Sequence, residues 1–352
     1  MKRLTSMSPQ RLEQIVAGFA RARIAVLGDY FLDKYLEVDP ALAEISVETG
    51  RRAHQVVGIR HSPGVAGTVI CNLASLGAGQ IHAIGITGDD GEGYDLRKDL
   101  AALGCRLEHL HQVAGLMTPT YLKPRDCGDP TLAGEHERYD TKNRRPTAPE
   151  LVERVIQSLD ALLPRLDAVI VADQVEQEEC GVVTTAVREA LADRARRWPS
   201  VVFWADSRRR IRRFRNLIIK PNQFEAVGQG NPQPGETVDP ARLENAIHTL
   251  RQQCGAPVCI TRGAAGMIVS DPETTEVPAV RLDGPLDPTG AGDSATAGAV
   301  LALCAGATLP EAALVGNLVA SITVQQLATT GTARADELLP RLSMWNEQQQ
   351  AY

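Results

Sequence analysis

Short aliphatic runs recur along the chain with helix-like segments between them, and this alternation restricts the fold more than any other sequence feature. Each run ends in polar residues or glycine, as buried strands of a parallel sheet commonly do. Helical patterns at 66–77 and 182–198 lie between successive runs. The runs are RIAVLGD (23–29), QIHAIGITGDD (80–90), DAVIVAD (167–173), VVFWAD (201–206), NLIIKPN (216–222) and APVCITRG (256–263). The pattern predicts an α/β fold with helices on both faces of a mostly parallel sheet.

Two segments, 34–62 and 105–140, do not follow this alternation. They contain short extended pieces joined by turn-rich stretches, such as AHQVVGIRH and PTYLKPR. We expect both segments to form a small β-sheet lid over the main core. No linker or internal repeat divides the chain, so residues 1–352 are predicted to form a single domain.

Polar residues follow the ends of the predicted strands. In open parallel sheets, ligands bind beyond the carboxyl ends of the strands. We therefore expect a ligand site where these residues meet. They are Asp29, Asp33, Asp173, Asp206, Asn222, Glu225, Thr261 and Gly263.

The stretch DPTGAGDSATAGAV (287–300) places Asp293 where a glycine-rich loop enters a helix. An acidic residue at a helix start can simply complement the helix dipole. Alternatively, Gly290, Ala291 and Gly292 allow a ligand to approach the backbone, and the free N–H groups of the first turn bind an anion. The loop by itself does not distinguish these two interpretations.

Charge and cysteine content exclude several classes of function. The formal net charge of −6 argues against nucleic acid as the main partner, because phosphate binding needs a basic face. The arginine run at 206–215 is interpreted as solvent-facing, with a phosphate-facing rim as the alternative. The 7 cysteines include no C-x-x-C pair, which is typical of a reducing compartment. The N-terminal region holds no apolar stretch of membrane-spanning length, so we expect a cytoplasmic protein with no membrane partner.

Familiar nucleotide-binding motifs are missing from the sequence. It contains no G-x-x-x-x-G-K-[ST], and VLGDYFLD stands where a dinucleotide-binding G-x-G-x-x-G would follow the first strand. An ordered set of other motifs is present instead: LGDYFLDKY, PGVAGTVICNLASLGA, GITGDDGEG, KPNQFE, ITRGAAGM and DPTGAGDSATAG. In order and spacing this set resembles the PfkB/ribokinase family of sugar kinases over nearly the whole chain. GDYFLDKY followed by EISVETG is most similar to the kinase domain of bacterial D-glycero-β-D-manno-heptose-7-phosphate kinases.

The resemblance implies a ribokinase-like three-layer α/β/α core and ATP-dependent phosphoryl transfer to a sugar or sugar-phosphate hydroxyl. Asp293 corresponds to the family's catalytic base, and Gly290, Ala291 and Gly292 to its anion hole. Glu225 corresponds to a residue that holds Mg²⁺ through water. The resemblance also implies nucleotide contacts by Asn222, Thr261, Gly263 and Asn317, and a monovalent-cation (K⁺) site that includes Asp287 and Thr289. A capping box at Asn222 and Glu225, and a packing role for Asn317, explain the same residues without a ligand.

On the sugar side, Asp33 corresponds to the family's hydroxyl-binding carboxylate. Lys123 and Arg138, on the expected lid, could receive an anionic substrate or remain solvated surface charges. The substrate loop departs from the family pattern: Gly64 is followed by Val65 instead of a second glycine, and Thr68 replaces an asparagine. Thr68 keeps a hydroxyl but lacks the donor and acceptor pair of an amide.

Three functions follow from these observations. The first is a sugar kinase, with heptose 7-phosphate as one candidate acceptor. The second is a kinase for another sugar or a nucleoside. The third is a sugar- or nucleotide-binding homologue that no longer catalyses, suggested by the altered substrate loop. Lids of this family often pair edge to edge, so a homodimer is expected.

Overall fold

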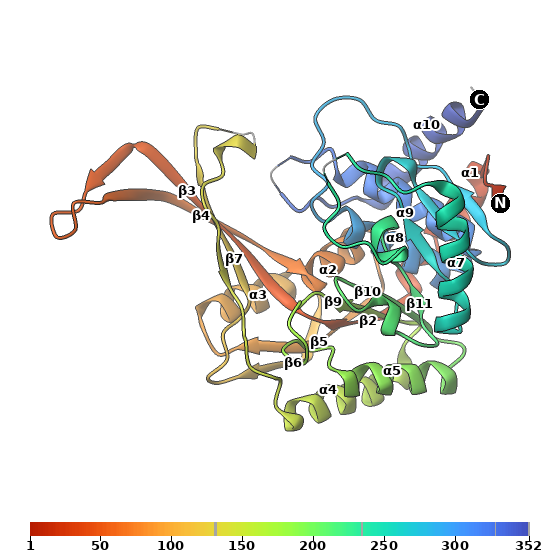
Figure 1. Ribbon diagram of the computed structural model, residues 1–352, viewed down its shortest axis with the longest axis horizontal. Helices are drawn as coiled ribbons and strands as arrows, with labels where there is room; N and C mark the ends of the chain where they lie inside the picture. The colour runs from red at the N-terminus through yellow and green to blue at the C-terminus, as the bar shows by residue number, and fades with distance from the viewer. Residues whose placement is uncertain (130–131, 234, 328, 351–352) are drawn as a thin grey trace.

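The core of the protein is a six-stranded, wholly parallel sheet with the strand order β11-β10-β9-β2-β5-β6 (Figure 1). The computed structural model describes residues 1–352 except 130, 131, 234, 328, 351 and 352. The strands are β2 (Arg23–Gly28), β5 (Gln80–Gly88), β6 (Arg106–Val113), β9 (Ala168–Asp173), β10 (Val202–Ser207) and β11 (Ile218–Ile219). The parallel sheet predicted from the aliphatic runs is confirmed.

Helices cover both faces of this sheet, because successive side chains of a buried strand point to opposite faces. Ile24 and Val26 of β2 belong to one hydrophobic cluster, and Ala25 and Leu27 to the other. The first cluster includes α1 (Pro9–Val16), α2 (Ala66–Ser75), α3 (Gly91–Ala102), α8 (Ala291–Cys304), α9 (Leu309–Thr323) and α10 (Leu338–Gln350). The second includes α4 (Pro149–Leu162), α5 (Thr185–Arg197), α6 (Gln223–Ala226) and α7 (Pro240–Cys254). The expected three-layer α/β/α arrangement is therefore present.

A smaller mixed sheet continues the central one beyond β11. Its strand order is β1-β14-β13-β12, and bridges from Ile219 to Val258 and from Asn222 to Thr261 connect it to the β11 region. The strands are β1 (Lys2–Arg3), β12 (Cys259–Thr261), β13 (Met267–Val269) and β14 (Thr275–Val277). No helix among the described residues combines the length and apolar character needed to cross a membrane.

A third sheet, here called the lid sheet, has the order β4-β3-β7-β8. It consists of β3 (Tyr30–Ile45), β4 (Arg52–Val65), β7 (Thr120–Asp126) and β8 (Tyr139–Thr141). The β3–β4 hairpin projects far from the body, at the left of Figure 1. Both strands of this hairpin are rooted in the core, since β3 starts two residues after β2 and β4 runs directly into α2.

The expected lid segment 105–140 is partly wrong. Its first part, Arg106–Val113, is the edge strand β6 of the central sheet and pairs in parallel with β5. Only the later part of the segment contributes β7 and the start of β8 to the lid sheet. An edge strand has one solvent-facing side and therefore carries polar residues, which made this stretch resemble an accessory piece.

Candidate active site

A glycine-rich turn leads into α8 and positions Asp293 in the first turn of the helix. Gly290 is the N-cap residue, and its φ of 74° lies in the left-handed region that glycine adopts without strain. No side chain caps this helix, so the N–H groups of its first turn are available to a ligand. The N–H of Ala291 is an exception, because it donates to the carbonyl of Pro288 at 3.1 Å. Of the three N–H groups of the predicted cradle, that of Ala291 is therefore already bonded, and the anion-binding role of the loop stays a prediction.

A buried lysine lies against this turn. Lys220 follows β11 and its Nζ forms an ion pair with Asp206 Oδ2 at 2.7 Å. A Cβ added to Gly292 would lie 3.3 Å from that Nζ, so the ammonium group is next to the loop backbone. Burial by itself lowers the pKa of Lys220, but attraction to Asp206, Asp293 and Glu225 outweighs it and raises the pKa above its ordinary value. Lys220 therefore remains charged beside the cradle.

Asn222 and Glu225 form the predicted capping box at the start of α6. The Asn222 side chain accepts the N–H groups of Phe224 and Glu225, both at 2.9 Å, and Glu225 Oε2 accepts the N–H of Asn222 at 2.8 Å. Thr261 lies beside them, since its N–H donates to the carbonyl of Pro221. This local bonding leaves Glu225 Oε1 free of any hydrogen bond within the capping box.

Two carboxyl groups at the site have strongly raised pKa values. Burial, with repulsion from Asp206 and Asp33, raises the pKa of Asp293 to about 7, although Lys220 opposes the shift. Burial also raises the pKa of Glu225 to about 7, aided by Asp206 and opposed by the N–H of Asn222. A carboxyl group with a pKa near neutrality is suited to accept a proton during catalysis.

A second ion pair lies on the lid sheet. Lys123 of β7 reaches Asp33 of β3, with Nζ 2.9 Å from Oδ1, and both residues are buried. A Cβ on Gly64 would lie only 2.8 Å from Asp33 Oδ2, so glycine is needed for this close approach. The charge of Asp33 contributes to the raised pKa of Asp293, which places the two carboxyl groups in one electrostatic environment. The structure thus brings together Asp33, Gly64, Lys123 and Asp293.

The substrate loop keeps a glycine-like backbone despite its valine. Val65 has φ 59° and ψ −112°, an unusual conformation for a β-branched residue. Thr68 is buried, and its Oγ1 donates to the carbonyl of Pro63 at 3.3 Å. Its methyl group is beside Gly290, because a Cβ there would lie 3.2 Å from Thr68 Cγ2. The substrate loop and the α8 turn therefore pack directly on each other.

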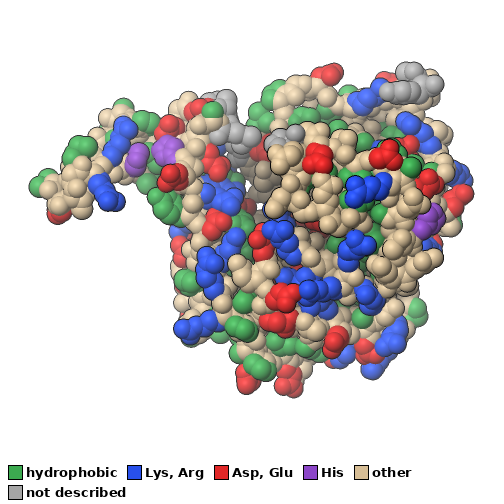
Figure 2. Space-filling view, viewed as in Figure 1, with side chains coloured by type: hydrophobic (Ala, Val, Ile, Leu, Met, Phe, Trp, Pro, Cys, Tyr) green, Lys and Arg blue, Asp and Glu red, His purple; other side chains and the backbone are tan. Residues whose placement is uncertain are grey.

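Three basic side chains surround the ring of Tyr121 on the lid sheet. Arg138 Cζ lies 4.6 Å, Lys142 Nζ 5.5 Å and Lys123 Nζ 6.0 Å from the ring centre. Arg138 also forms a bidentate pair with Asp140, at 2.7 and 3.0 Å. We call Lys123, Arg138 and Lys142 the lid cations. Figure 2 shows a hollow between the lid sheet and the body of the protein, with Lys and Arg side chains at its rim.

The other predicted site residues have local contacts that explain their positions without a ligand. The Asn317 side chain donates to the carbonyls of Val277 and Pro278, at 3.0 and 3.2 Å, which supports its packing role. Asp287 Oδ1 accepts the N–H of Thr289 at 3.0 Å, a bond that stabilises the turn without requiring a cation. Gly263 begins a short 3₁₀ turn with φ 56°. Their expected nucleotide and cation contacts remain predictions.

Sequence reasoning missed three features of this region. It named neither Lys220 nor Lys142, although the KPNQFE motif contains the first of them. It also treated the arginine run as a surface feature, whereas Arg210 is buried and pairs with Asp173 at 2.6 Å. The two apolar residues within the arginine run, Ile211 and Phe214, are both buried and were the available signal that this part of the run turns inward.

The arrangement is equipped for phosphoryl transfer. Such a reaction needs a base for the attacking hydroxyl and fixed positive charge near the moving group, held in position relative to each other. Asp293 can serve as such a base, and the start of α8 and Lys220 can provide the positive charge. Asp33 can accept hydrogen bonds from the hydroxyl groups of an acceptor.

Comparison with known proteins agrees with this chemistry. The model of the pfkB family of carbohydrate kinases matches residues 36–335. The bifunctional protein HldE of Gluconobacter oxydans is 27% identical over 327 residues, covering 92% of this chain and 65% of the relative. HldE of Stutzerimonas stutzeri is 30% identical over 325 residues, covering 88% of this chain and 62% of the relative. The chain thus spans just under two thirds of the length of these curated relatives.

Solved structures with the same fold are more distant in sequence. A ribokinase from Cryptococcus neoformans, crystallised with ADP, has a TM-score of 0.62 at 20% identity, covering 93% of this chain and 99% of that one. Phosphofructokinase-2 from Escherichia coli, crystallised with substrates and products, has a TM-score of 0.67 at 17% identity, covering 92% and 98%. The fold is therefore ribokinase-like.

Proposed function

The chain belongs to the pfkB family of carbohydrate kinases, which are phosphotransferases with a hydroxyl acceptor, and from this premise we propose that it transfers the γ-phosphoryl group of ATP to a sugar phosphate. The observation that carries the proposal is the position of Asp293, next to Lys220 and within the electrostatic influence of Asp33. The acceptor we favour is a phosphorylated sugar such as heptose 7-phosphate. Because ATP is a cytoplasmic donor, we place the reaction in the cytoplasm.

In the proposed reaction, Asp293 accepts the proton of the attacking hydroxyl while that oxygen bonds to the γ-phosphorus and the bond to the ADP oxygen breaks. Lys220 and the N–H groups at the start of α8 stabilise the negative charge of the phosphoryl group. Asp33, held by Lys123, orients the acceptor through hydrogen bonds to its hydroxyl groups. We propose that Thr261 and Asn222, which lie side by side, contact the nucleotide phosphates.

Magnesium fits the acidic surroundings of Glu225. The described residues contain no group of three or more His, Cys, Asp or Glu side chains that could hold a metal by themselves. Mg²⁺ typically keeps several waters and binds through one or two carboxylates together with substrate phosphates. Glu225, with Asp206 near it, would hold the ion in this way, and the ion would neutralise phosphate charge during transfer. A monovalent cation at Asp287 and Thr289 remains part of the proposal.

The lid cations support an anionic acceptor. Arg138 and Lys142 share one carboxylate, Asp140, so the group retains positive charge on the side facing Tyr121. A guanidinium fork matches the geometry of phosphate oxygens. We therefore expect Arg138 to bind the phosphate that the acceptor already carries.

A turnover assay across sugars and sugar phosphates tests the proposed function. We expect ATP-dependent turnover with a phosphorylated sugar, and Arg138→Gln to raise the KM for that acceptor by about tenfold, since a hydrogen bond to a charged group contributes about 1.5–3 kcal/mol. The KM for ATP should be unchanged. Arg196→Gln, on the exposed face of α5, is the matched control.

The assay also distinguishes the competing functions. Turnover restricted to an unphosphorylated sugar or a nucleoside would favour another acceptor. Binding of ATP and sugar without turnover would indicate a homologue that no longer catalyses. Either result would overturn the proposal as stated.

We further propose that two copies associate through the β3–β4 hairpin. The projecting part of this hairpin leaves several aliphatic side chains largely exposed to solvent (Figure 2). They are Leu42, Ile45, Val47, Val56, Val57 and Ile59. Exposed apolar patches of this kind mark association surfaces, and a second copy offers the same surface.

Light scattering after size-exclusion chromatography tests this association. Ile59→Glu places a charge in the apolar surface, so we expect it to shift a dimer to a monomer at micromolar concentration. Met344→Glu, on the partly exposed face of α10, is the matched control and should leave the mass unchanged. A wild-type monomer, or a dimer that survives Ile59→Glu, would contradict hairpin-mediated association.

A further inference from the structure

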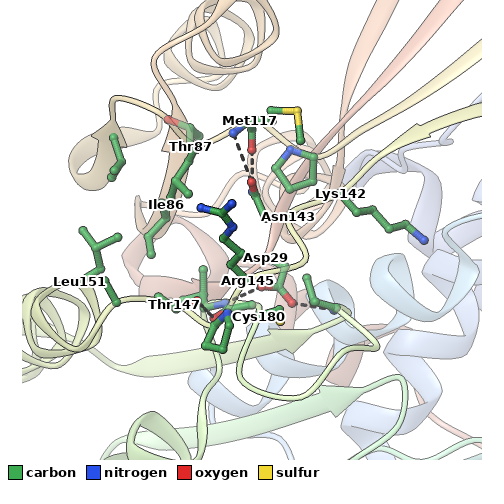
Figure 3. Close-up of a pocket in the computed structure, with 18 of the residues that line it drawn as sticks. Asp29, Ile86, Thr87, Met117, Lys142, Asn143, Arg145, Thr147, Leu151 and Cys180 are labelled. Atoms are coloured by element: carbon green, nitrogen blue, oxygen red, sulfur yellow. Dashed lines mark hydrogen bonds between the residues drawn. The ribbon is translucent and has the colours of Figure 1, made fainter.

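A cavity of about 740 Å³ lies apart from the residues assigned to phosphoryl transfer. It is enclosed by three loops, 113–119, 142–148 and 175–182, at the carboxyl ends of β2, β5 and β6 (Figure 3). None of Asp33, Lys220 and Asp293 lines it. Its volume is within the range of small-molecule sites.

The loops that form this cavity are bonded to one another, so its shape is largely preformed. Asn143 and Met117 exchange two hydrogen bonds, at 2.7 and 3.2 Å. Thr147 joins the third loop, since its Oγ1 donates to the carbonyl of Gly181 at 2.8 Å and its N–H donates to the carbonyl of Glu179 at 2.7 Å. Figure 3 shows the two bonds between Asn143 and Met117 beside the hollow. A preformed cavity loses little entropy when a ligand binds.

The charge of the cavity wall is positive. Figure 3 places the guanidinium group of Arg145 between Ile86 and Asn143, and no acidic side chain among the described residues pairs with it. Helix α4 begins beside it at Pro149, and Ala148 lines the cavity without supplying a side-chain cap. The start of a helix carries partial positive charge. At α4, however, Pro149 has no N–H, the N–H of Leu151 donates to the carbonyl of Ala148 at 2.9 Å, and Glu150 places a negative charge in the first turn. The positive charge at this end of the cavity therefore comes mainly from arginine.

Asp29 is the one acidic residue among those that line the cavity, and both of its carboxylate oxygens already have hydrogen-bond partners. Asp29 Oδ2 accepts the N–H groups of Gln174 and Val175, and Oδ1 accepts that of Val182, all within 2.9 Å. Lys142 contributes only its stem, because its amine lies near Tyr121 and Asp140. The positive charge of the wall therefore comes from Arg144 and Arg145, which both line the cavity.

A buried hydroxyl group independently indicates a missing partner. Thr87 lines the cavity and is only 1% exposed, yet its Oγ1 has no hydrogen-bond partner among the residues that the structure describes. A buried polar atom without a partner is costly, and native proteins rarely leave one. Ile86, Leu151 and Val182 provide apolar wall next to it.

We propose that this cavity binds a small phosphate ester, with its phosphate at Arg145 and a polar group of its body at Thr87. The site is separate from the acceptor site, and its ligand is a phosphorylated metabolite that is not consumed there. Loop 175–182 forms one wall of the cavity and begins two residues after Asp173, the last residue of β9, which is buried and paired with Arg210. A bound ligand would therefore hold this loop in one position relative to β9.

Cysteine alkylation provides a local test, because Cys180 lines the cavity and Cys127 is exposed elsewhere on the lid side of the chain. We expect fructose 6-phosphate, at millimolar concentration, to slow iodoacetamide modification of Cys180 at least fivefold, as measured by peptide mass spectrometry. Fructose should have no effect, and Cys127 should react equally in every sample. Equal reaction of Cys180 with and without fructose 6-phosphate would overturn the proposal.

Variants separate this cavity from the acceptor site. Arg145→Gln and the nearly isosteric Thr87→Val should each abolish or weaken the protection, whereas Arg196→Gln should leave it intact. The protection should persist in Asp33→Asn, which impairs the acceptor site. If Asp33→Asn removes the protection, or Arg145→Gln does not, the probe acts elsewhere and the separate site is refuted. Calorimetric titration of fructose 6-phosphate into the Asp33→Asn protein should give the same ranking of variants.

Discussion

Replacing Asp293 with asparagine is expected to lower kcat by about 10²- to 10⁴-fold, the usual loss when a general base is removed. Asparagine keeps the shape and most hydrogen bonds of the side chain but cannot accept a proton. ATP binding, measured by calorimetry, should persist or tighten slightly, because the substitution removes a negative charge near the γ-phosphate. Steady-state kinetics with the best acceptor measure the effect. If kcat stays within a few-fold of wild type, Asp293 only complements the helix dipole.

The pH dependence supplies a second readout for the same residue. Burial raises the pKa of Asp293 to about 7, so the base is protonated below that pH and kcat/KM of the wild type should rise as the pH passes through about 7. The folded state binds this proton more tightly than the unfolded chain does, so ionisation of Asp293 costs stability as the pH rises. Asp293→Asn removes that cost, and its Tm at pH 8 should be no lower than that of wild type. Asp283→Asn, at an exposed aspartate on the same stretch of chain, should change neither rate nor profile.

The second large effect is expected at Lys220. Lys220→Met removes the fixed positive charge beside Gly292, and loss of one group that stabilises transition-state charge typically lowers kcat by about 10²- to 10³-fold. The change should also raise the pKa of Asp293 further, because Lys220 opposes the shift caused by burial and by Asp206. The rising limb of the pH–rate profile should therefore move to higher pH.

Lys220→Met also breaks a largely buried ion pair, so its effect on folding must be separated from its effect on rate. Leaving one partner of a buried pair uncompensated costs about 3–5 kcal/mol, which urea denaturation would detect. The double variant Lys220→Met with Asp206→Asn should recover much of this stability but none of the rate. Recovery of rate together with stability would show that Lys220 acts only through the fold.

Much of the core could be predicted because its signals are local. Each aliphatic run that ends in polar residues or glycine proved to be, or to contain, a strand, and the parallel arrangement follows from the helices between the runs. The capping box at Asn222 and the glycine turn before Asp293 are likewise encoded within a few residues. The ion pair of Lys123 with Asp33 and the close approach of Gly64 to Asp33 involve strands distant in sequence, and the catalytic and binding roles of these residues and of Asp293 stay predictions.

The remainder depends on contacts between segments that are distant in sequence. The segment 106–113 joins the central sheet because β5 is beside it, and nothing within the segment itself specifies that partner. Lys220 becomes important only because Asp206 and the turn at Gly292 meet it from other parts of the chain. The cavity beside Thr87 is formed by three separate loops and leaves no pattern in any one of them.

The backbone conformation at Val65 lowers the conformational stability of the protein. A β-branched residue at φ 59° is strained by about 1–3 kcal/mol, and glycine would adopt the same conformation without that penalty. Selection for folding alone would therefore favour glycine between Gly64 and Ala66. Val65 directly follows Gly64, whose backbone packs against Asp33, so this penalty falls beside the proposed acceptor site. Position 65 is accordingly where attempts to engineer a new acceptor range should begin.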